Sequence, residues 1–420
     1  MSENTTIEPG KLFRRGLGLK KEVAGTLDRE YSSHIIDFFR QNDYKVKVGR
    51  FVIHLAKEFG FCYGVDRAID YAYQTREHFP DKRIFLTGEL IHNPHVNRKM
   101  QEMGIEFLTG TYARENAMDQ LNPQDVVILP AFGVSIQHME HFRTVGCTLV
   151  DTTCGSVLSV WKRVHSYAKD GFTSLIHGKW NHEETIATSS QALKFPNAHY
   201  LVVLDMAEAE KVCDYIRGDM DRESFMKKFA NAMSPGFDPD EHLLHIGCAN
   251  QTTMLSGESL AIANRVKDEM SKKYGEENLA DHFRSFDTIC SATQDRQNAI
   301  NELLNQHTMD VMIIIGGYNS SNTTHLVEIS GEQTSAFHID DASCLESLQQ
   351  IRHQPVHQKD EIHTQNWLPN GDLVIGITAG ASTPNNKIGE AVMRVLQIRG
   401  IRLDPEPDLP AASTADASTD

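Results

Sequence analysis

The sequence lacks any uninterrupted apolar run of the roughly 18 residues that a membrane-spanning helix needs. Its longest apolar stretches, such as Val311–Ile315, have the length of a strand. The chain also lacks an excess of basic residues, since its net charge is -16. Phosphate backbones and anionic membranes bind clustered Lys and Arg, so this balance argues against both as partners. We therefore expect no membrane segment and no nucleic-acid surface.

Several common site motifs are also missing. The sequence contains neither a Walker A motif nor GxGxxG, which removes the usual grounds for predicting nucleotide binding. It contains no HExxH either, because His182, Glu183 and Glu184 are followed by Thr185 and Ile186. A zinc protease of that class is therefore not supported.

The seven cysteines are too few and too widely spread for the disulfide framework of a small secreted protein. Residues 1–46 mix both charge signs and contain no apolar core or small-residue cleavage site, so neither a secretory signal nor a transit peptide fits. We expect reduced thiols and a cytoplasmic location. In that setting a cysteine that follows a strand is a candidate for metal binding or catalysis.

Apolar strand-like runs alternate with helical periodicity along the body of the chain, a pattern typical of parallel α/β sheets. The runs are FVIHLA, RIFLTG, DVVILP, TLVDTT, TSLIHG, HYLVVL, HLLHIG, VMIIIGG, SAFHID and DLVIGIT. We divide the chain into an N-terminal extension (1–50), with a helical segment over 29–40, three α/β domains (51–150, 151–285 and 286–403) and a disordered acidic tail (404–420).

Three cysteines share one sequence context, in which an apolar stretch leads to a polar turn, then Cys, then an amphipathic helix. The segments are FGFC-YGVDRAI at Cys62, DTTC-GSVLSVW at Cys154 and DTIC-SATQDRQNAI at Cys290. Such a cysteine lies where a sheet edge meets a helix N-terminus, which favours ligand binding and a thiolate. We interpret Cys147, Cys213 and Cys344 as structural; Cys248 is the one competitor, and we favour packing for it.

Three thiolates would leave one iron of a 4Fe-4S cluster open for a substrate oxygen, whereas four would close it. The spacings of 92 and 136 residues put one ligand in each predicted domain, although spacing this wide is weak evidence by itself. Polar loops at other strand ends fit an anionic, hydroxylated substrate. They contain His92, Lys179, His182, Glu184, Thr252, Ser320, Ser321, Asn322 and Ser382.

From about residue 11 to residue 399, the chain resembles the LytB/IspH family of 4-hydroxy-3-methylbut-2-enyl diphosphate reductases, especially its cyanobacterial and plant-type branch. The matching motifs are GFCYGVDRA, ELIHNP, LPAFGVS, VDTTC, HGKWNHEETIATS, ANQTTML, TICSATQDRQ, GGYNSSNTTHL and TAGASTP. The resemblance implies three α/β domains in pseudo-threefold arrangement around a central iron-sulfur cluster. It implies reductive dehydroxylation of an allylic diphosphate to isopentenyl and dimethylallyl diphosphates, with a ferredoxin or flavodoxin as electron donor.

Carried over by motif, the resemblance also implies residue roles. Cys62, Cys154 and Cys290 resemble the ligands of one 4Fe-4S cluster with one open iron. Glu184 resembles the proton donor, and Thr252 the hydroxyl that orients it. The set that resembles the diphosphate site is His92, His182, Ser320, Asn322 and Ser382, with Ser321 beside it.

Two positions depart from the family pattern. Phe132 stands where many bacterial members have a phosphate-binding histidine, and we hypothesise that Lys179 supplies the missing positive charge. Gly155 follows Cys154 where the family usually has Pro, which predicts a looser turn. Two alternatives remain at this stage: a quinolinate synthase-type enzyme with a three-cysteine cluster, and a non-enzymatic iron-sulfur or zinc sensor.

Overall fold

The computed structural model describes residues 10–286, 288–369 and 371–403, so the expected tail over 404–420 lies outside the described residues. The chain divides into two compact units. Unit 1 comprises residues 1–24 and 62–295, and unit 2 comprises residues 25–61 and 296–420. Within the described ranges, no helix is both long and apolar enough to cross a membrane.

The first sheet of unit 1 is entirely parallel, with strand order β1-β7-β6-β4-β5. Its strands are β1 (Leu12–Phe13), β4 (Ile84–Leu86), β5 (Ile105–Phe107), β6 (Val126–Leu129) and β7 (Thr148–Asp151). The accompanying helices are α3 (Tyr63–His78), α4 (Pro94–Glu102) and α5 (Ile136–Val145), with a short 3₁₀ turn at Met118–Gln120. Every residue of β4 and β6 is buried, as expected for strands covered on both faces.

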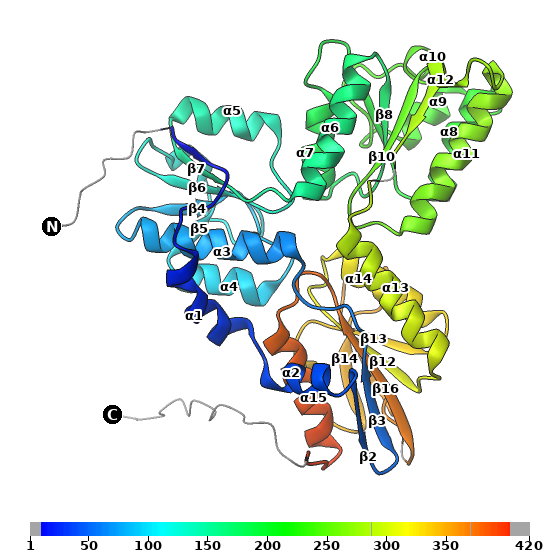
Figure 1. Ribbon diagram of the computed structural model, residues 1–420. Coiled ribbons are helices and arrows are strands. Elements are labelled where there is room, and N and C mark those ends of the chain that lie inside the picture. Colours follow the sequence, from blue (N-terminus) through cyan, green and yellow to red (C-terminus); the bar gives the residue numbers. More distant parts are fainter. Residues whose placement is uncertain (1–9, 287, 370, 404–420) are drawn as a thin grey trace. The chain divides into compact units, whose positions relative to one another are not determined.

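The second sheet of unit 1 is also parallel, with strand order β11-β10-β8-β9 (Figure 1). Its strands are β8 (Thr173–His177), β9 (Tyr200–Val203), β10 (Ile246–Asn250) and β11 (Phe283–Ser285). Its helices are α6 (Gly155–Lys169), α7 (Glu183–Ala192), α8 (Met206–Arg217), α9 (Arg222–Lys228), α10 (Pro239–His242), α11 (Ser256–Tyr274) and α12 (Leu279–His282). In Figure 1, α6 and α7 lie on one side of this sheet and α8 and α11 on the other.

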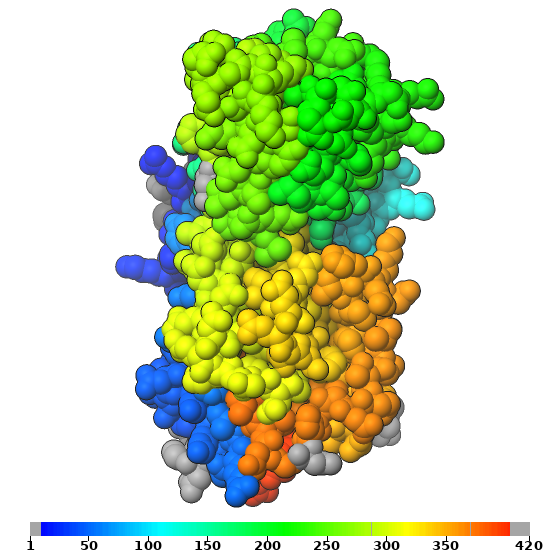
Figure 2. Space-filling view, turned by 90° about the vertical axis from the view of Figure 1, so that its right-hand side faces the viewer, coloured from blue at the N-terminus to red at the C-terminus, as the bar shows by residue number. Residues whose placement is uncertain are grey.

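Unit 2 contains the third sheet, with strand order β13-β12-β16-β3-β2. Its strands are β2 (Lys45–Val48), β3 (Phe51–Leu55), β12 (Val311–Ile315), β13 (Ser335–Ile339) and β16 (Leu373–Ala379), and only the edge pair β2–β3 is antiparallel. The helices are α2 (His34–Gln41), α13 (Ser291–Gln306), α14 (Ser321–Gly331) and α15 (Asn385–Ile398), while α1 (Lys20–Tyr31) and α13 each cross a unit boundary. Part of the surface of α13 and α14 faces the viewer in Figure 2, in yellow.

Three parallel-type α/β sheets are confirmed, but their sequence boundaries differ from those we expected. Strand β3, expected to open the first domain, pairs with β16 in the third sheet. The extension over 1–50 is not a separate arm either, because β1 joins the first sheet and β2 the third. The helical segment over 29–40 is broken between α1 and α2, and α2 buries Ile35, Ile36 and Phe39 in the core of unit 2.

A two-stranded hairpin is among the elements that the sequence patterns did not indicate. Strands β14 (Gln350–His353) and β15 (Ile362–Gln365) form a two-stranded antiparallel hairpin in unit 2. The 3₁₀ turn Ala342–Cys344 precedes it and buries Cys344. The hairpin has a largely exposed second strand, which explains why no apolar pattern announced it.

Candidate active site

Three cysteines stand at the starts of three helices, as the sequence predicted. Cys62 is the N-cap residue of α3, Cys154 is the N-cap residue of α6, and Cys290 immediately precedes α13. Neither Cys62 nor Cys154 uses its side chain to cap its helix. All three are partly exposed free thiols, whereas Cys147, Cys213, Cys248 and Cys344 are buried free thiols. A thiol at a helix N-terminus is placed to become a thiolate and bind metal.

The three thiols of unit 1 lie close to one another. A Cβ atom added at Gly64 would lie 2.6 Å from the sulfur of Cys154 and 3.9 Å from the sulfur of Cys62. Only glycine therefore fits between these two sulfurs. Burial, with smaller contributions from Cys62 and Glu184, raises the pKa of the Cys290 thiol to about 11 against the opposing effect of two Thr293 hydrogen bonds. Three converging, partly exposed thiols without a disulfide are a donor set that fits an iron-sulfur cluster.

Arg67 links the start of α3 to the turn that precedes α6. Arg67, one turn into α3, donates hydrogen bonds from Nη2 to the carbonyl oxygens of Thr152 and Thr153. These two residues form the turn between β7 and Cys154. Helix α6 begins at Gly155, and a Cβ atom added there would meet no atom within 4 Å, so the space at this position would also accept a larger residue.

Glu184 is a buried acid at the start of α7, with only 2% of its surface exposed. Its carboxylate accepts hydrogen bonds from the backbone N–H of Thr252 at 2.6 Å and from the Thr252 hydroxyl at 2.9 Å. Burial raises the pKa of Glu184 to about 7, although the two Thr252 hydrogen bonds and the charge of His92 act in the opposite direction. Near neutral pH this side chain is poised to donate a proton.

Thr252 connects this acid to the third cysteine. Its carbonyl oxygen accepts a hydrogen bond from the backbone N–H of Cys290 at 3.3 Å, while its own N–H and hydroxyl hold Glu184. The Cys290 sulfur contacts the Thr293 hydroxyl at 2.9 Å. The arrangement puts a protonatable carboxyl group beside the three-thiol group within a single unit.

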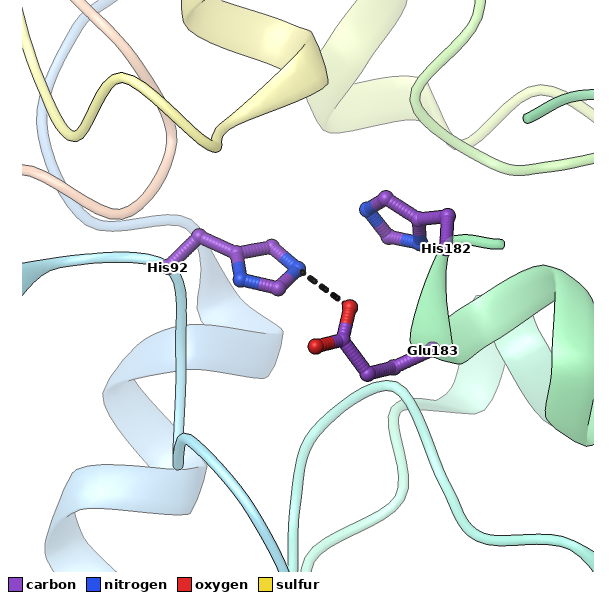
Figure 3. A group of neighbouring side chains, drawn as sticks. All are labelled: His92, His182 and Glu183. Atoms are coloured by element: carbon purple, nitrogen blue, oxygen red, sulfur yellow. Dashed lines mark ion pairs between the residues drawn. The ribbon is translucent and has the colours of Figure 1, made fainter. Parts of the chain in front are cut away.

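Two histidines and a phenylalanine form an aromatic group near the start of α7. The rings of His92 and Phe132 are stacked, with centroids 4.7 Å apart and planes 8° apart, and His182 meets His92 edge-on at 4.9 Å. Figure 3 shows His92 extending toward Glu183 and His182, and the His92–Glu183 ion pair measures 3.7 Å. Phe132 therefore replaces a donor with a flat apolar surface that orients His92.

The protonation of His182 favours an anion over a metal ion. Its Nδ1 accepts a hydrogen bond from the backbone N–H of Glu184 at 3.2 Å, so the neutral ring carries its proton on Nε2. Burial lowers the pKa of His182 well below its usual range, and the charges of His92 and Lys179 lower it further. The Nε2–H is buried without a hydrogen-bond partner in the described residues. Atoms of His92, His182 and Glu183 lie within 4.8 Å of one another, but this N–H offers a donor instead of a lone pair.

Lys179 is close enough to His182 to influence its charge, as the compensation hypothesis requires. Substitution of Lys179 by Ala is expected to raise the KM for a diphosphate substrate about tenfold with little change in kcat, because one charge-assisted contact is lost. Steady-state kinetics would measure both constants. The matched control is Lys194→Ala, an exposed lysine of the same unit. An unchanged KM in Lys179→Ala would end the hypothesis.

The remaining predicted residues form a polar group in unit 2. Ser320 is the N-cap residue of α14, and its hydroxyl accepts from the Thr323 N–H at 3.4 Å. The Asn322 Oδ1 accepts from the Ala381 N–H at 2.9 Å, which leaves the buried Asn322 Nδ2 without a partner in the described residues. Ser321 and Ser382 are also buried, and Ser382 follows β16. A helix start, hydroxyl groups and an amide are groups that can together bind an anion.

Sequence reasoning missed three residues that position the site. Glu89 Oε2 lies 2.9 Å from His92 Nδ1 and orients the ring. The Gln251 Oε1 accepts from the Lys179 N–H and the Thr185 hydroxyl, each at 3.1 Å, and so joins two of the polar loops. Glycine is required at position 64 because a Cβ atom there would lie 2.6 Å from the Cys154 sulfur. Of these three residues, Glu89 alone had a local signal in the sequence, because it lies three residues before His92.

Comparisons with known proteins identify the family of this chain. The family model described as "LytB protein" matches residues 53–397. A 4-hydroxy-3-methylbut-2-enyl diphosphate reductase from Gloeobacter violaceus is 47% identical over 393 residues, which cover 93% of each chain. The enzyme of the same name from Thermosynechococcus vestitus is 48% identical and covers 92% of this chain and 95% of its own.

Two solved structures are similar as well. One is that of (E)-4-hydroxy-3-methyl-but-2-enyl diphosphate reductase, with 26% identity and a TM-score of 0.50, covering 82% of this chain and 99% of its own. The other is that of the E-1-hydroxy-2-methyl-but-2-enyl-4-diphosphate reductase from Plasmodium falciparum, with 23% identity and a TM-score of 0.59, covering 82% of this chain and 87% of its own. At this level of identity the similarity shows the fold alone. The family match over most of the chain and the 47–48% identical relatives establish that this chain belongs to the LytB family.

Proposed function

We propose that this chain reduces 4-hydroxy-3-methylbut-2-enyl diphosphate to isopentenyl diphosphate and dimethylallyl diphosphate, the last step of the methylerythritol phosphate route to isoprenoids. The family membership and the names of the relatives support this oxidoreductase activity. The observation that carries the chemistry is the buried Glu184 carboxyl beside three converging thiols. Neither a quinolinate synthase-type enzyme nor a sensor is supported by the comparisons.

We propose further that Cys62, Cys154 and Cys290 hold one 4Fe-4S cluster and leave one iron without a protein ligand. The family is one of iron-sulfur enzymes, and the donor set of this chain fits such a group. When bound, the cluster would supply electrons one at a time and a Lewis-acidic iron at its open corner.

The overall reaction breaks the C4–O bond and consumes two electrons and two protons. One proton leaves with the hydroxyl oxygen as water, and the other adds to either end of the allyl system, which accounts for two products. Glu184 supplies protons from its carboxyl group, since burial raises its pKa to about 7 and so lets the acid form exist near neutral pH. Thr252 holds the carboxyl through two hydrogen bonds and can pass a proton through its hydroxyl.

The diphosphate is assigned to the buried donors described above. The Nε2–H of His182 and the Nδ2 amide of Asn322 are buried donors with no protein partner in the described residues, as an incoming anion requires. His92, Ser320, Ser321 and Ser382 complete the proposed set. Their role is to fix the substrate so that its hydroxyl group lies at the reacting position.

The electrons must come from outside the chain, and we propose a ferredoxin or flavodoxin-type donor. We also place the reaction in the cytoplasm. All seven cysteines are free thiols, as a reducing compartment implies.

Anaerobic turnover tests the proposed function. Purified protein with intact cluster would be mixed with reduced viologen and 4-hydroxy-3-methylbut-2-enyl diphosphate, and dye oxidation and product masses would be followed. We expect both C5 diphosphates and one water per two dye molecules oxidised. A protein with verified cluster that oxidises no dye would reject the reductase assignment.

The pKa of Glu184 predicts a pH dependence. The acid form is the reactive one, so kcat is expected to fall about tenfold per pH unit above about 7, where the carboxyl loses its proton. Because this pKa is raised from 4.5, the carboxyl's contribution to folding stability is fully present below pH 4.5 and is lost as the pH rises through about 7. A kcat–pH profile with viologen would measure the first effect. A profile that stays flat to pH 9 would contradict the assignment of the acid.

A further inference from the structure

An 11-residue segment near the N-terminus reverses the charge of the chain locally. The protein has a net charge of -16, yet residues 11–21 (KLFRRGLGLKK) contain five basic residues and no acidic one. We call residues 11–21 the basic segment. Its cations are Lys11, Arg14, Arg15, Lys20 and Lys21, all of them exposed.

The basic segment is fixed to the first sheet and to α3. Strand β1 pairs in parallel with β7, and the Leu149 N–H donates to the Lys11 carbonyl oxygen at 2.8 Å. The backbone N–H groups of Leu17 and Leu19 both donate to the Gln74 side-chain oxygen, at 2.9 and 3.2 Å. Figure 1 shows the segment, in dark blue, leaving β1 and passing beside α3. Its charges therefore have a defined place in unit 1.

That place adjoins the starts of two cysteine-bearing helices. Strand β7 ends at Asp151, three residues before Cys154, and Arg14 pairs with Asp151 at 3.7 Å. Lys20 acts on Asp66, four residues after Cys62, and lowers its pKa against the larger opposite effect of burial. Positive charge thus lies beside both thiol-bearing turns.

An exposed aromatic residue lies at the start of α3, the helix that the basic segment contacts through Gln74. Tyr63 directly follows Cys62 and is 82% exposed, the highest value among the large hydrophobic residues of the described chain. Basic side chains around an exposed aromatic side chain are a typical composition of an interface, with the aromatic as anchor and the charges at the rim.

We propose that the basic segment and Tyr63 form the docking surface for a small acidic one-electron carrier protein. The proposal rests on the proposed function, which consumes two electrons that must enter near the thiols. Most of the surface of an acidic protein repels an acidic carrier, so a local basic patch would steer the carrier to a place near the thiol-bearing turns. The small size of the patch and the overall acidity do not fit a nucleic acid or an anionic membrane.

Charge reversal tests the proposal in the cluster-containing full chain. The test variant combines Arg15→Glu, Lys20→Glu and Lys21→Glu, and leaves Arg14 with its partner Asp151. The matched control combines Lys169→Glu, Lys227→Glu and Lys267→Glu, three exposed lysines on helices around the second sheet. The probe is an acidic plant-type ferredoxin. Its Kd is measured by titration at low and high salt, and its KM is measured in anaerobic turnover.

In the test variant, the Kd and KM for ferredoxin are expected to rise at least about tenfold at low salt. Both constants should then depend much less on salt than in the wild type. Turnover with reduced viologen, which needs no docking surface, stays at the wild-type rate, and the control matches the wild type throughout. Tyr63→Ala is expected to raise Kd without changing its salt dependence. A milder Gln triple variant at the same three positions replaces the reversal if the latter unfolds.

An unchanged ferredoxin Kd in the test variant, or an equal rise in the control, would overturn the docking surface. A parallel loss of viologen turnover would also overturn it, because the segment would then act on the cluster site itself. Wild-type protein that binds ferredoxin through these residues without reducing substrate would support the surface and reject the function. The two proposals therefore fail in different experiments.

Discussion

Substitution of Glu184 by Gln is expected to lower turnover by about 10² to 10⁴-fold while the protein keeps its iron. Glutamine has the shape of the carboxyl group and can still accept from the Thr252 N–H, so the local structure stays in place. The substitution removes the acidic proton of Glu184, whose pKa burial raises to about 7. The measurement is kcat with reduced viologen, with iron content determined on the same sample.

The neighbouring Glu183 provides a matched control. It is the same residue type and lies one residue earlier in α7, but its side chain is 52% exposed and pairs with His92 at 3.7 Å. Glu183→Gln should therefore change kcat less than about threefold. Equal losses in the two variants would show that the effect is one of general charge near α7 and would remove Glu184 as the proton donor.

Replacement of Cys154 by Ser is expected to abolish iron binding and with it all measurable turnover. Serine preserves the size of the side chain, and the Arg67 hydrogen bonds to the preceding turn do not involve the sulfur, so the fold is retained. A cluster that loses one of three protein ligands is left with two thiolates. Iron and sulfide content, visible absorption and anaerobic turnover would be measured after reconstitution.

Cys213→Ser is the control for this substitution. Cys213 is buried in α8 of the same unit, and its thiol makes a long contact to the Arg265 carbonyl oxygen, at 3.9 Å. This variant should bind iron like the wild type. If Cys154→Ser kept a full complement of iron and sulfide, the proposed ligand set would be wrong.

The sequence predicted individual helices and strands better than it predicted which strands pair with one another. The helix after Cys62 buries Val65, Ala68, Ile69 and Ala72, the face that its periodicity indicated. Strand β3 was recognised as a strand, but its pairing with β16, more than 300 residues later, leaves no trace in either segment. Strand order is decided by tertiary packing, so domain boundaries drawn from sequence order placed β3 with the wrong sheet. Strand β1 has two residues, too few for any pattern.

The candidate site shows the same division between chemistry and geometry. Residue types and motifs gave a set of candidate side chains, and the structure brings the three thiols, Glu184 and Thr252 of that set together in unit 1. They could not predict that Phe132 stacks on His92, because the substitution signals only a lost donor. The sequence also could not predict the tautomer of His182, because that tautomer depends on a hydrogen bond from the backbone N–H of Glu184.

Mössbauer spectroscopy of protein reconstituted with isotopically enriched iron tests the central claim most directly. Three cysteine ligands predict three irons of one kind and one distinct iron, and 4-hydroxy-3-methylbut-2-enyl diphosphate should change the signal of the distinct iron alone. Four equivalent thiolate-bound irons, unaffected by the substrate, would contradict both the ligand set and the proposed reaction.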